Sequence, residues 1–346
     1  MIVDRAWVER NLGFDPIRDP PPISTFAVTT PGGAPTTDLQ REIIEWDSES
    51  PAGLQFLAFS KATGLSRYKE IKWPKGLAPQ TSADPGGGGN NPLPNADVLV
   101  VTWTVEEGHA LSRVLTPGKD SQNDYRSYTH GYEKLSKLMQ PGCPARQAAR
   151  LGAFWVTQIG DKAVVIFKSD SHMSQDGPKL PNLLLWRQII NEVQPRLVIT
   201  TGTGGGIGDK YEVGDVVASS IVRFDCISKF KAKAFAHDHY SSLPANTSYF
   251  DKAIELFKTN ASQLPQENTR DPKITVSAPD ALSESVVTTD FFGFDTSDNH
   301  YKLQGLGTVS EMGDAVLGLA ACEMGQEPPA GLPSGMFQTH RSRRMG

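Results

Sequence analysis

The sequence predicts an α/β fold, in which the strands of a sheet alternate with helices. The apolar strand Leu197–Thr200 runs directly into a glycine-rich segment. A second buried-strand pattern, 97–102, is followed by helical spacing over 104–115. Residues 153–157 and 163–168 read as a hairpin, and a helical pattern at 183–193 leads back to the strand at 197. Strand, helix and return to the sheet are the units of an α/β fold.

The glycine-rich segment runs from Gly202 to Gly208. Glycines without a Cβ let backbone N–H groups turn outward and let a ligand approach the main chain. In open α/β sheets, ligands bind where such loops follow the strands. A tight left-handed turn between two strands is the alternative. No Lys-Ser/Thr follows the glycines, which argues against a P-loop, and a strand after Gly214 argues against a dinucleotide fold.

Composition excludes several functional classes. The chain has 346 residues, a net charge of −5 and a pI near 5.8, so it has no electrostatic footprint for nucleic acid or an anionic membrane. Cys143, Cys226 and Cys322 have neither pairing nor metal spacing and are expected to be reduced. No apolar run approaches the ~18 residues of a membrane helix. We expect a soluble cytoplasmic protein with no metal and no cofactor.

The chain divides by composition into three parts. Residues 1–94 form a Pro/Gly-rich extension that ends in the linker Gly86–Pro92, and no function can be assigned to them. Residues 95–325 carry the strand and helix patterns. Within them, 226–280 reads as a variable insertion, 285–288 as a strand, and 308–324 as a segment that opens a helix. Residues 326–346 lack a strand pattern.

The phrase VITTGTGGGIG…VGDVVASSIVRFD resembles the nucleoside phosphorylase/nucleosidase superfamily, of the purine nucleoside phosphorylase and methylthioadenosine-adenosylhomocysteine nucleosidase type. The resemblance covers about residues 96–325, with three motifs in the family's order. It implies a three-layer sandwich, in which helices flank a central mixed, twisted sheet. It also implies a homo-oligomer that binds a nucleoside or nucleotide and cleaves its N-ribosidic bond.

The resemblance maps the family's catalytic carboxylate onto Glu107, with Glu106 as the alternative. Such a group activates the nucleophile or orients the ribose during general acid–base catalysis. A purely structural explanation also exists, because acidic residues in the first turn of a helix favour its macrodipole.

For ribose, the family uses a phrase of the form x-E-M-E, and this chain reads Glu311-Met312-Gly313-Asp314. Met312 aligns, but a glycine replaces the second glutamate, so Glu311 or Asp314 would have to supply the carboxylate. For the base, the family places a Phe after a short acidic segment. Here that position falls in Thr289–Phe294, where a ring could stack on a heterocycle. The expected substrate-binding residues are Thr203, Gly204, Gly205, Phe291, Phe292, Glu311, Met312 and Asp314.

The nucleophile, phosphate or water, is the least determined feature. Lys168, His172 and Arg223 are candidates for this phosphate or water site, although they could equally be solvated loop charges. Asp170 lies between the first two in the sequence and would repel phosphate, which favours water.

The tail departs from the family, whose domain closes with a strand of the form V-V-R-x-V/I-S-D. The Asp of that strand protonates the departing purine. With suitable synonymous codons and one base restored near codon 331, the bases of GLPSGMFQTHRSRRMG read WLAVRNVSDPQIAAD. We therefore hypothesise that residues 326–346 are an aberrant tail produced by a single-base frameshift, with a divergent tail as the alternative. Such a chain would lack its acid and a core strand.

Three functional classes follow. The first is an enzyme that cleaves an N-glycosidic bond, with hydrolysis favoured over phosphorolysis. The second is a catalytically impaired nucleoside-binding protein. The third is an effector arm, in which residues 1–94 or 226–280 dock a partner that the sequence does not identify.

Overall fold

The computed structural model describes residues 2–3, 71, 73–81, 88–120, 124–211, 214–241, 252, 255–256, 259, 273–277, 281–291, 299, 301–311 and 313–326. The chain forms two compact units, which are named here after one glutamate in each. The Glu107 unit comprises Pro21–Gln175 and Ile189–Gly202. The Glu311 unit comprises Met1–Pro20, Asp176–Gln188 and Thr203–Gly346.

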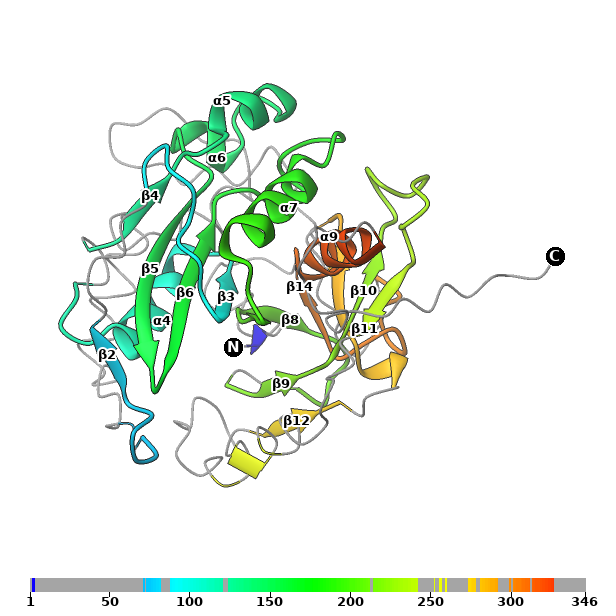
Figure 1. The fold of residues 1–346 in the computed structure, drawn as a ribbon. Helices are drawn as coiled ribbons and strands as arrows, with labels where there is room; N and C mark the ends of the chain where they lie inside the picture. Colours follow the sequence, from blue (N-terminus) through cyan, green and yellow to red (C-terminus); the bar gives the residue numbers. More distant parts are fainter. Residues whose placement is uncertain are drawn as a thin grey trace, which may run out of the picture. The chain divides into compact units, whose positions relative to one another are not determined.

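The sheet of the Glu107 unit has the strand order β2-β5-β6-β3-β7 (Figure 1). Strand β3 is central and parallel to both β6 and β7, whereas β5 runs antiparallel to β6, β2 and a further strand, β4. The bounds are β2 Pro79–Thr81, β3 Val98–Thr102, β4 Arg126–Tyr128, β5 Gly152–Ile159, β6 Lys162–Ser169 and β7 Leu197–Thr200. The apolar runs of β3 and β6 are buried almost continuously, as strands covered on both faces require. This confirms the predicted hairpin and both predicted parallel strands.

Helix α4 (Val105–Leu115) packs against β6. Of its apolar residues, Leu111 and Leu115 pack against a buried cluster of the sheet, whereas Ala110 and Val114 are exposed. The helix also buries Gly108 and Ser112. A Cβ at Gly108 would lie 3.2 Å from both Lys168 Cγ and Trp155 Cη2, so the absence of a side chain allows the helix to approach the sheet closely. The spacing of apolar side chains does not reveal a helix face that packs through small residues such as glycine and serine.

The remaining helices of this part of the chain are short, except α7. They are α5 (Tyr132–Leu135), the 3₁₀ turn η1 (Ser136–Leu138) and α6 (Pro144–Gln147). Helix α7 (Pro181–Val193) confirms the helix predicted from residue 183. Its last turn belongs to the Glu107 unit, where the Val193 carbonyl accepts a hydrogen bond from Ala96 N (3.0 Å), just before β3.

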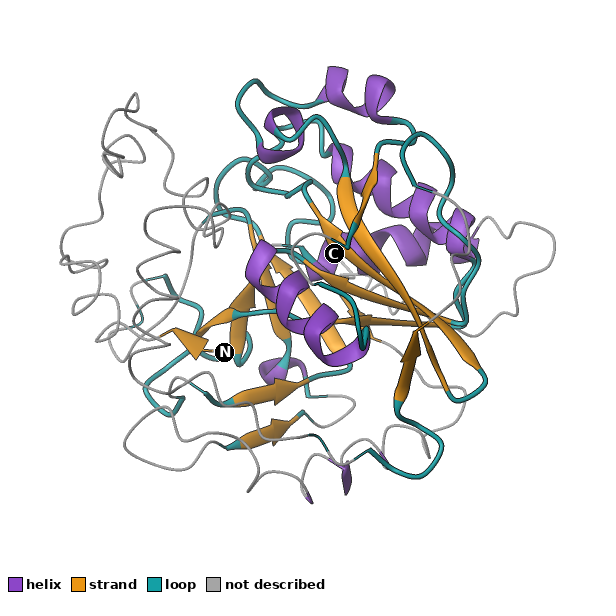
Figure 2. Cartoon of the chain, turned by 90° about the vertical axis from the view of Figure 1, so that its left-hand side faces the viewer, coloured by secondary structure: helices purple, strands orange, loops and turns teal. Residues whose placement is uncertain are grey.

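The Glu311 unit contains a second six-stranded sheet, with the order β1-β8-β14-β13-β10-β11, and a two-stranded pair, β12-β9. Pairs β10–β13, β13–β14 and β1–β8 are parallel, and β14–β8 and β10–β11 are antiparallel. The bounds are β1 Ile2–Val3, β8 Gly204–Gly206, β9 Val216–Ala218, β10 Ile221–Asp225, β11 His239–Ser241, β12 Ile274–Val276, η3 Leu282–Glu284, β13 Val286–Thr289, β14 Val309–Glu311 and α9 Asp314–Gln326. Helix α9 packs on β10, β11 and β13 (Figure 1). Figure 2 colours the chain by secondary structure and shows helices beside the strands. Both six-stranded sheets are mixed and carry helices, which confirms the predicted α/β class.

The glycine run forms a strand rather than a turn. Gly204 to Gly206 pair with β14 on one side and with β1 on the other, and none of the three has a positive φ. A Cβ at Gly204 would collide with the side chain of Val309 and lie 2.8 Å from the Ser310 carbonyl oxygen. Gly204 is therefore required for the close approach of β14 to β8.

Two further differences from the sequence expectation concern element ends. Residues 309–311 form strand β14, and the helix expected from this segment begins at Asp314. Strands β1 and β2 come from the predicted extension 1–94, and each is an edge strand of a six-stranded sheet. Met312, Phe292, the tail from 327 onward and most of the predicted insertion lie outside the described residues.

Candidate active site

Three chain segments leave the sheet of the Glu107 unit at one edge. Strands β3, β6 and β7 are parallel, with Thr102 opposite Lys168 and Val101 opposite Thr200. The residues that follow these strands therefore lie at the same carboxyl-terminal edge, where open α/β sheets bind ligands. Glu107 follows β3, the 169–175 segment follows β6, and Gly202 follows β7.

Glu107 is nine-tenths buried and its carboxylate is held firmly. Its Oε2 accepts hydrogen bonds from Thr102 Oγ1 (2.7 Å), Trp103 N (3.0 Å) and Thr104 N (2.9 Å). Thr104 is the N-cap of α4 and accepts a hydrogen bond from Glu107 N in return, which completes a capping box. The same bonds that start the helix thus orient the carboxylate at the end of β3.

The glycine-rich segment meets this carboxylate within the same unit. A Cβ at Gly202 would lie 3.1 Å from Glu107 Oε1 and 3.3 Å from Oε2. Any residue larger than glycine at position 202 would therefore displace the Glu107 carboxylate.

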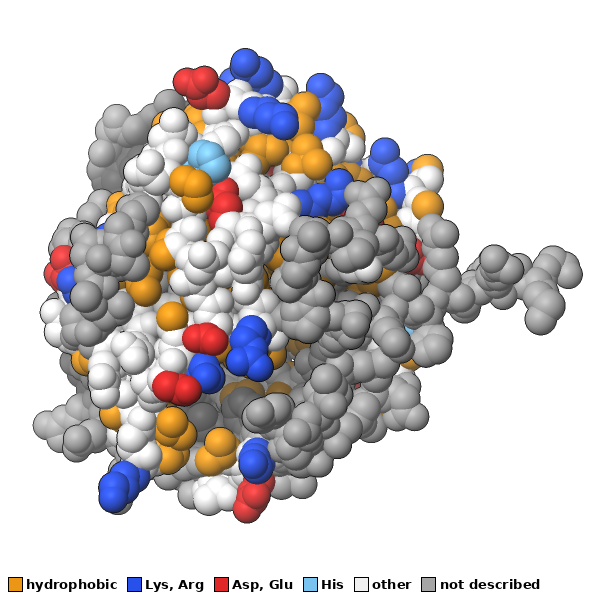
Figure 3. All heavy atoms as spheres, in the orientation of Figure 1, with side chains coloured by type: hydrophobic (Ala, Val, Ile, Leu, Met, Phe, Trp, Pro, Cys, Tyr) orange, Lys and Arg blue, Asp and Glu red, His pale blue; other side chains and the backbone are white. Residues whose placement is uncertain are grey.

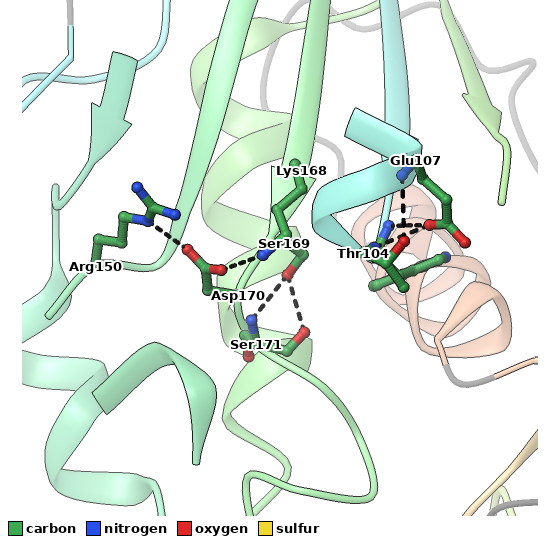
Figure 4. A network of polar contacts seen from close by, with 8 residues as sticks. Thr104, Glu107, Arg150, Lys168, Ser169, Asp170 and Ser171 are labelled. Carbon is green, nitrogen blue, oxygen red and sulfur yellow. Dashed lines mark hydrogen bonds and ion pairs between the residues drawn. The ribbon is translucent and has the colours of Figure 1, made fainter. Parts of the chain in front are cut away.

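An ion-pair network follows β6 (Figure 4). Asp170 receives a hydrogen bond from Arg150 Nε at 2.7 Å on one oxygen and a short one from Lys168 Nζ on the other. Both Lys168 and Asp170 are 3% exposed. Burial by itself would raise the pKa of Asp170, but the charges of Lys168 and Arg150 outweigh burial and hold that pKa below its usual value. The two cations are thus already neutralised in part by this carboxylate.

His172 lies beside this network and is completely buried. Neither ring nitrogen has a hydrogen-bond partner among the described residues, and the ring stands 6.3 Å from that of Trp103. Burial, together with the charge of Lys168, lowers the pKa of His172 to about 3. The imidazole is therefore neutral at physiological pH and supplies no positive charge to an anion.

In the Glu311 unit, the Glu311 carboxyl ends β14 and accepts hydrogen bonds from Gly313 N (2.5 Å) and Asp314 N (2.9 Å) and a short one from Thr288 Oγ1. Burial and the neighbouring Asp314 raise its pKa well above the ordinary value. Glu311 thus caps the N-terminus of α9 in the segment where the family's ribose phrase was expected. Asp314 is the first residue of that helix.

The other predicted site residues of this unit lie in three places. Gly204 and Gly205 are in β8, directly after Thr203. Phe291 packs its ring 5.3 Å from that of Tyr301, at the border of a buried cluster. Arg223 lies on β10, donates to the Leu306 carbonyl oxygen at 3.4 Å, and has its pKa lowered mainly by burial.

Sequence comparison identifies the family. A family model described as the phosphorylase superfamily matches residues 130–328. The chain belongs to this superfamily. The match confirms the resemblance predicted from the glycine-rich phrase and gives the general enzyme class, nucleosidase or phosphorylase. Among curated proteins, no relative matches the chain.

Several solved structures are similar to this phosphorylase-superfamily chain. A 5′-methylthioadenosine/S-adenosylhomocysteine nucleosidase from Neisseria meningitidis in complex with methylthio-immucillin-A is 16% identical, over 67% of this chain and 82% of that one, with a TM-score of 0.40. The corresponding enzyme from Colwellia psychrerythraea in complex with adenine is 20% identical, over 68% and 79%, with a TM-score of 0.39. A futalosine hydrolase mutant of Helicobacter pylori is 12% identical, over 65% and 82%, with a TM-score of 0.39.

Sequence reasoning missed two residues that organise these loops. Arg150 pairs with Asp170 across 20 positions of sequence, because the β5–β6 hairpin folds back on itself, and no local pattern indicates such a pair. Asp290 follows β13 and its carboxylate accepts hydrogen bonds from Ile227 N, Ser228 N and Phe230 N at 2.7–3.1 Å. It thereby holds the loop after β10.

Metal-binding and membrane-spanning features are absent from the described part of the chain. It contains no group of three or more His, Cys, Asp or Glu side chains arranged to hold a metal ion. Within the same residues, no helix has the length and apolar character needed to cross a membrane. All three cysteines are buried, and none of them takes part in a disulfide bond. On the face seen in Figure 3, positive and negative side chains are interspersed.

Proposed function

We propose that this phosphorylase-superfamily chain cleaves the N-glycosidic bond of a purine nucleoside or nucleotide, with water as the nucleophile. The observation that carries the proposal is the position of Glu107. Its carboxylate is held by three hydrogen bonds at the edge where β3, β6 and β7 end, next to the first glycine of the glycine-rich segment. A fixed carboxylate at a ligand crevice is what a general base requires.

In this reaction the bond between C1′ of the ribose and the base nitrogen breaks, and a bond forms between C1′ and the water oxygen. Glu107 takes a proton from the water, and the departing base takes one from an acid. Fixed dipoles and charges around the sugar would stabilise the positive charge that develops on the ring. By the family resemblance, Glu311, Met312 and Asp314 are proposed to bind the ribose and Phe291 or Phe292 the base, with Thr203 to Gly205 as further substrate-binding residues.

Water is favoured over phosphate because of the network after β6. Lys168, one of the candidates for the nucleophile site, is paired with Asp170, which also pairs with Arg150. His172, another candidate, is neutral at physiological pH because burial lowers its pKa to about 3. Phosphorolysis remains the second candidate, since the two cations on this one carboxylate leave a net positive charge.

The proposal extends to the tail. The family match ends at residue 328, three positions before the codon at which we place the frameshift. Without the restored strand the chain would lack the acid that protonates the leaving base, which is worth about 10²–10⁴-fold in rate. A chain that binds a nucleoside but releases little base is therefore the alternative function. A cytoplasmic location and a homo-oligomeric assembly complete the proposal.

The test is free-base release, measured by chromatography from a panel of purine and pyrimidine nucleosides and nucleotides, with and without phosphate. The chain as written is compared with one in which the single base is restored. We expect base release from the restored chain without a need for phosphate. A requirement for phosphate would establish phosphorolysis instead. Ligand binding without base release from both folded chains would refute the proposed reaction and favour the binding protein.

A further inference from the structure

The Arg150–Asp170–Lys168 network has the form of an occupied oxyanion site. Each cation contacts a different oxygen of the Asp170 carboxylate, as two cations would contact two oxygens of a bound anion (Figure 4). Lys168 and Asp170 are almost completely buried, and the Arg150 side chain is 19% exposed. Buried charges of this kind persist only when they are paired.

The charges of this network decide which nucleophile it tolerates. Two cations and one carboxylate leave a net charge of about +1 in the ordinary protonation states of these groups. A phosphate dianion next to Asp170 would set three negative charges against the two cations, and like charges within a few ångströms repel strongly in a buried site. If Asp170 were neutral, the same dianion would match both cations.

The network also lies close to the element that carries the proposed base. The aliphatic part of the Lys168 side chain packs against helix α4. A Cβ added to Gly108 would lie 3.2 Å from Lys168 Cγ and 3.3 Å from Lys168 Cβ. Gly108 is the residue directly after Glu107. Lys168 itself lies opposite Thr102, whose hydroxyl donates to Glu107. The ion-pair network and the proposed base thus share one edge of one sheet.

We propose that Asp170 is an internal substitute for an oxyanion: it fills the site between Arg150 and Lys168 and so commits the enzyme to water. Replacing Asp170 by a neutral residue opens a binding site for inorganic phosphate or sulfate. The binding part of this proposal stands on the network alone, and the choice of nucleophile rests on the proposed function.

The reaction expected of such a variant is balanced without any further reactant. A phosphate oxygen forms the new bond to C1′, the C1′–N bond breaks with its electron pair passing to the base, and the base nitrogen takes up a proton. The products are the free base and ribose 1-phosphate, in place of the free base and ribose.

The test begins with anion binding to Asp170→Asn, which keeps the size of the side chain. Thermal unfolding is followed in chloride, phosphate and sulfate at equal ionic strength. In chloride the variant should unfold earlier than the wild type, because two buried cations have lost their counter-charge. Phosphate and sulfate should both raise its Tm, by about 4 °C or more at saturation, and leave the wild-type Tm unchanged.

Two further variants make the result specific. Asp161→Asn removes an exposed carboxylate that pairs with Lys162 at 2.8 Å and should give no anion-dependent shift. The double variant Asp170→Asn/Lys168→Met keeps only the charge of Arg150, so the net charge of the network returns to the wild-type value of about +1. With one of the two cations gone, it should fold in chloride and bind neither anion. If Asp170→Asn is recovered only from buffers that contain phosphate or sulfate, that rescue is itself the expected result.

Absence of any anion-dependent stabilisation in folded Asp170→Asn, or an equal shift in Asp161→Asn or the double variant, would overturn the proposal. Product analysis then separates it from the proposed function. Base release by the frame-restored chain, together with no anion binding to its Asp170→Asn variant, would leave the hydrolase in place and refute the oxyanion site. Anion binding to Asp170→Asn in a frame-restored chain that releases no base from any substrate would support the site and refute the reaction.

Discussion

Gly202 lies against the carboxylate of Glu107, so closely that a Cβ on Gly202 would stand 3.1 Å from Glu107 Oε1. The two residues are far apart in the sequence and meet because β7 and β3 are neighbouring parallel strands. Glu107 has little freedom to retreat, since its Oε2 accepts hydrogen bonds from two backbone N–H groups and a hydroxyl group. The absence of a side chain at Gly202 therefore leaves the Glu107 carboxylate, the proposed general base, in its hydrogen-bonded orientation.

Gly202→Ala should reduce base release by between about 10-fold and 100-fold, because it displaces the carboxylate by a few tenths of an ångström or strains its hydrogen bonds. Steady-state kinetics on the frame-restored chain would measure the loss. Gly325→Ala is the matched control, because a Cβ at this position of helix α9 would meet no atom within 4 Å. An equal loss in both variants would contradict a specific role for Gly202.

Glu107→Gln should lower the rate by about 10²–10⁴-fold with little loss of stability. The amide oxygen of glutamine can still accept the hydrogen bonds of the capping box, so the start of α4 survives. Glu106→Gln, at the neighbouring position, is the comparison that decides which glutamate acts. A larger loss at Glu106 would transfer the role of general base to that residue.

Glu311 should make the protein less stable as the pH rises. Burial first and Asp314 second raise its pKa, so the folded chain binds this proton more tightly than the unfolded chain does. The stabilisation is present below the ordinary glutamate pKa and is lost as the pH rises toward the raised value. Urea denaturation across this range should show a falling free energy of unfolding, and Glu311→Gln should remove that slope.

Asp314→Asn provides the internal check on this pH dependence. It removes the neighbouring charge and leaves burial unchanged, so it should reduce the slope only in part. A slope identical in the wild type, Glu311→Gln and Asp314→Asn would show that other groups cause it.

His172 should destabilise the protein at acidic pH. Its pKa falls from 6.5 to about 3 on folding, chiefly through burial, so the unfolded chain binds the proton more tightly. The stabilisation is complete above the unfolded pKa and is lost as the pH falls through the range from 6.5 to 3. Between about pH 7 and pH 5 we expect a loss of about 2 kcal/mol.

His172→Asn should flatten that acid limb, as followed by urea denaturation at several pH values. His237→Asn, at an exposed histidine, is the control and should leave the limb unchanged. An acid limb that persists in His172→Asn would mean that its imidazole is not buried in the neutral form.

The tail hypothesis predicts a defect in the DNA. Sequencing of codons 325–346 in independent isolates should recover a reading frame that encodes WLAVRNVSD after residue 330. Restoring that frame should raise both the thermal stability, through the recovered strand, and the rate of base release, by about 10²–10⁴-fold. Isolates that all share the present frame would support a divergent tail.

The sequence predicted the family and the strands β3, β5, β6, β7 and β13 because their signals are local. The apolar runs at 98–102 and 162–169 bury on both faces of a sheet, and the turn at Gly160 has the positive φ that a hairpin often needs. It did not predict β14, since three residues before a helix carry too little periodicity to separate a strand from a first turn. It also did not indicate that α4 buries the small residues Gly108 and Ser112.

By itself, the sequence determined that this chain is an α/β protein of the phosphorylase superfamily, that Glu107 follows a strand and that Lys168 ends one. Such statements depend on short-range sequence patterns and on motifs that follow one another in the order of the family. Only the tertiary structure decided what those side chains contact: Gly202 against Glu107, and Arg150 sharing Asp170 with Lys168. These contacts join segments that are distant in the chain, and the burial that lowers the pKa of His172 and raises that of Glu311 exists only when the sheets are packed.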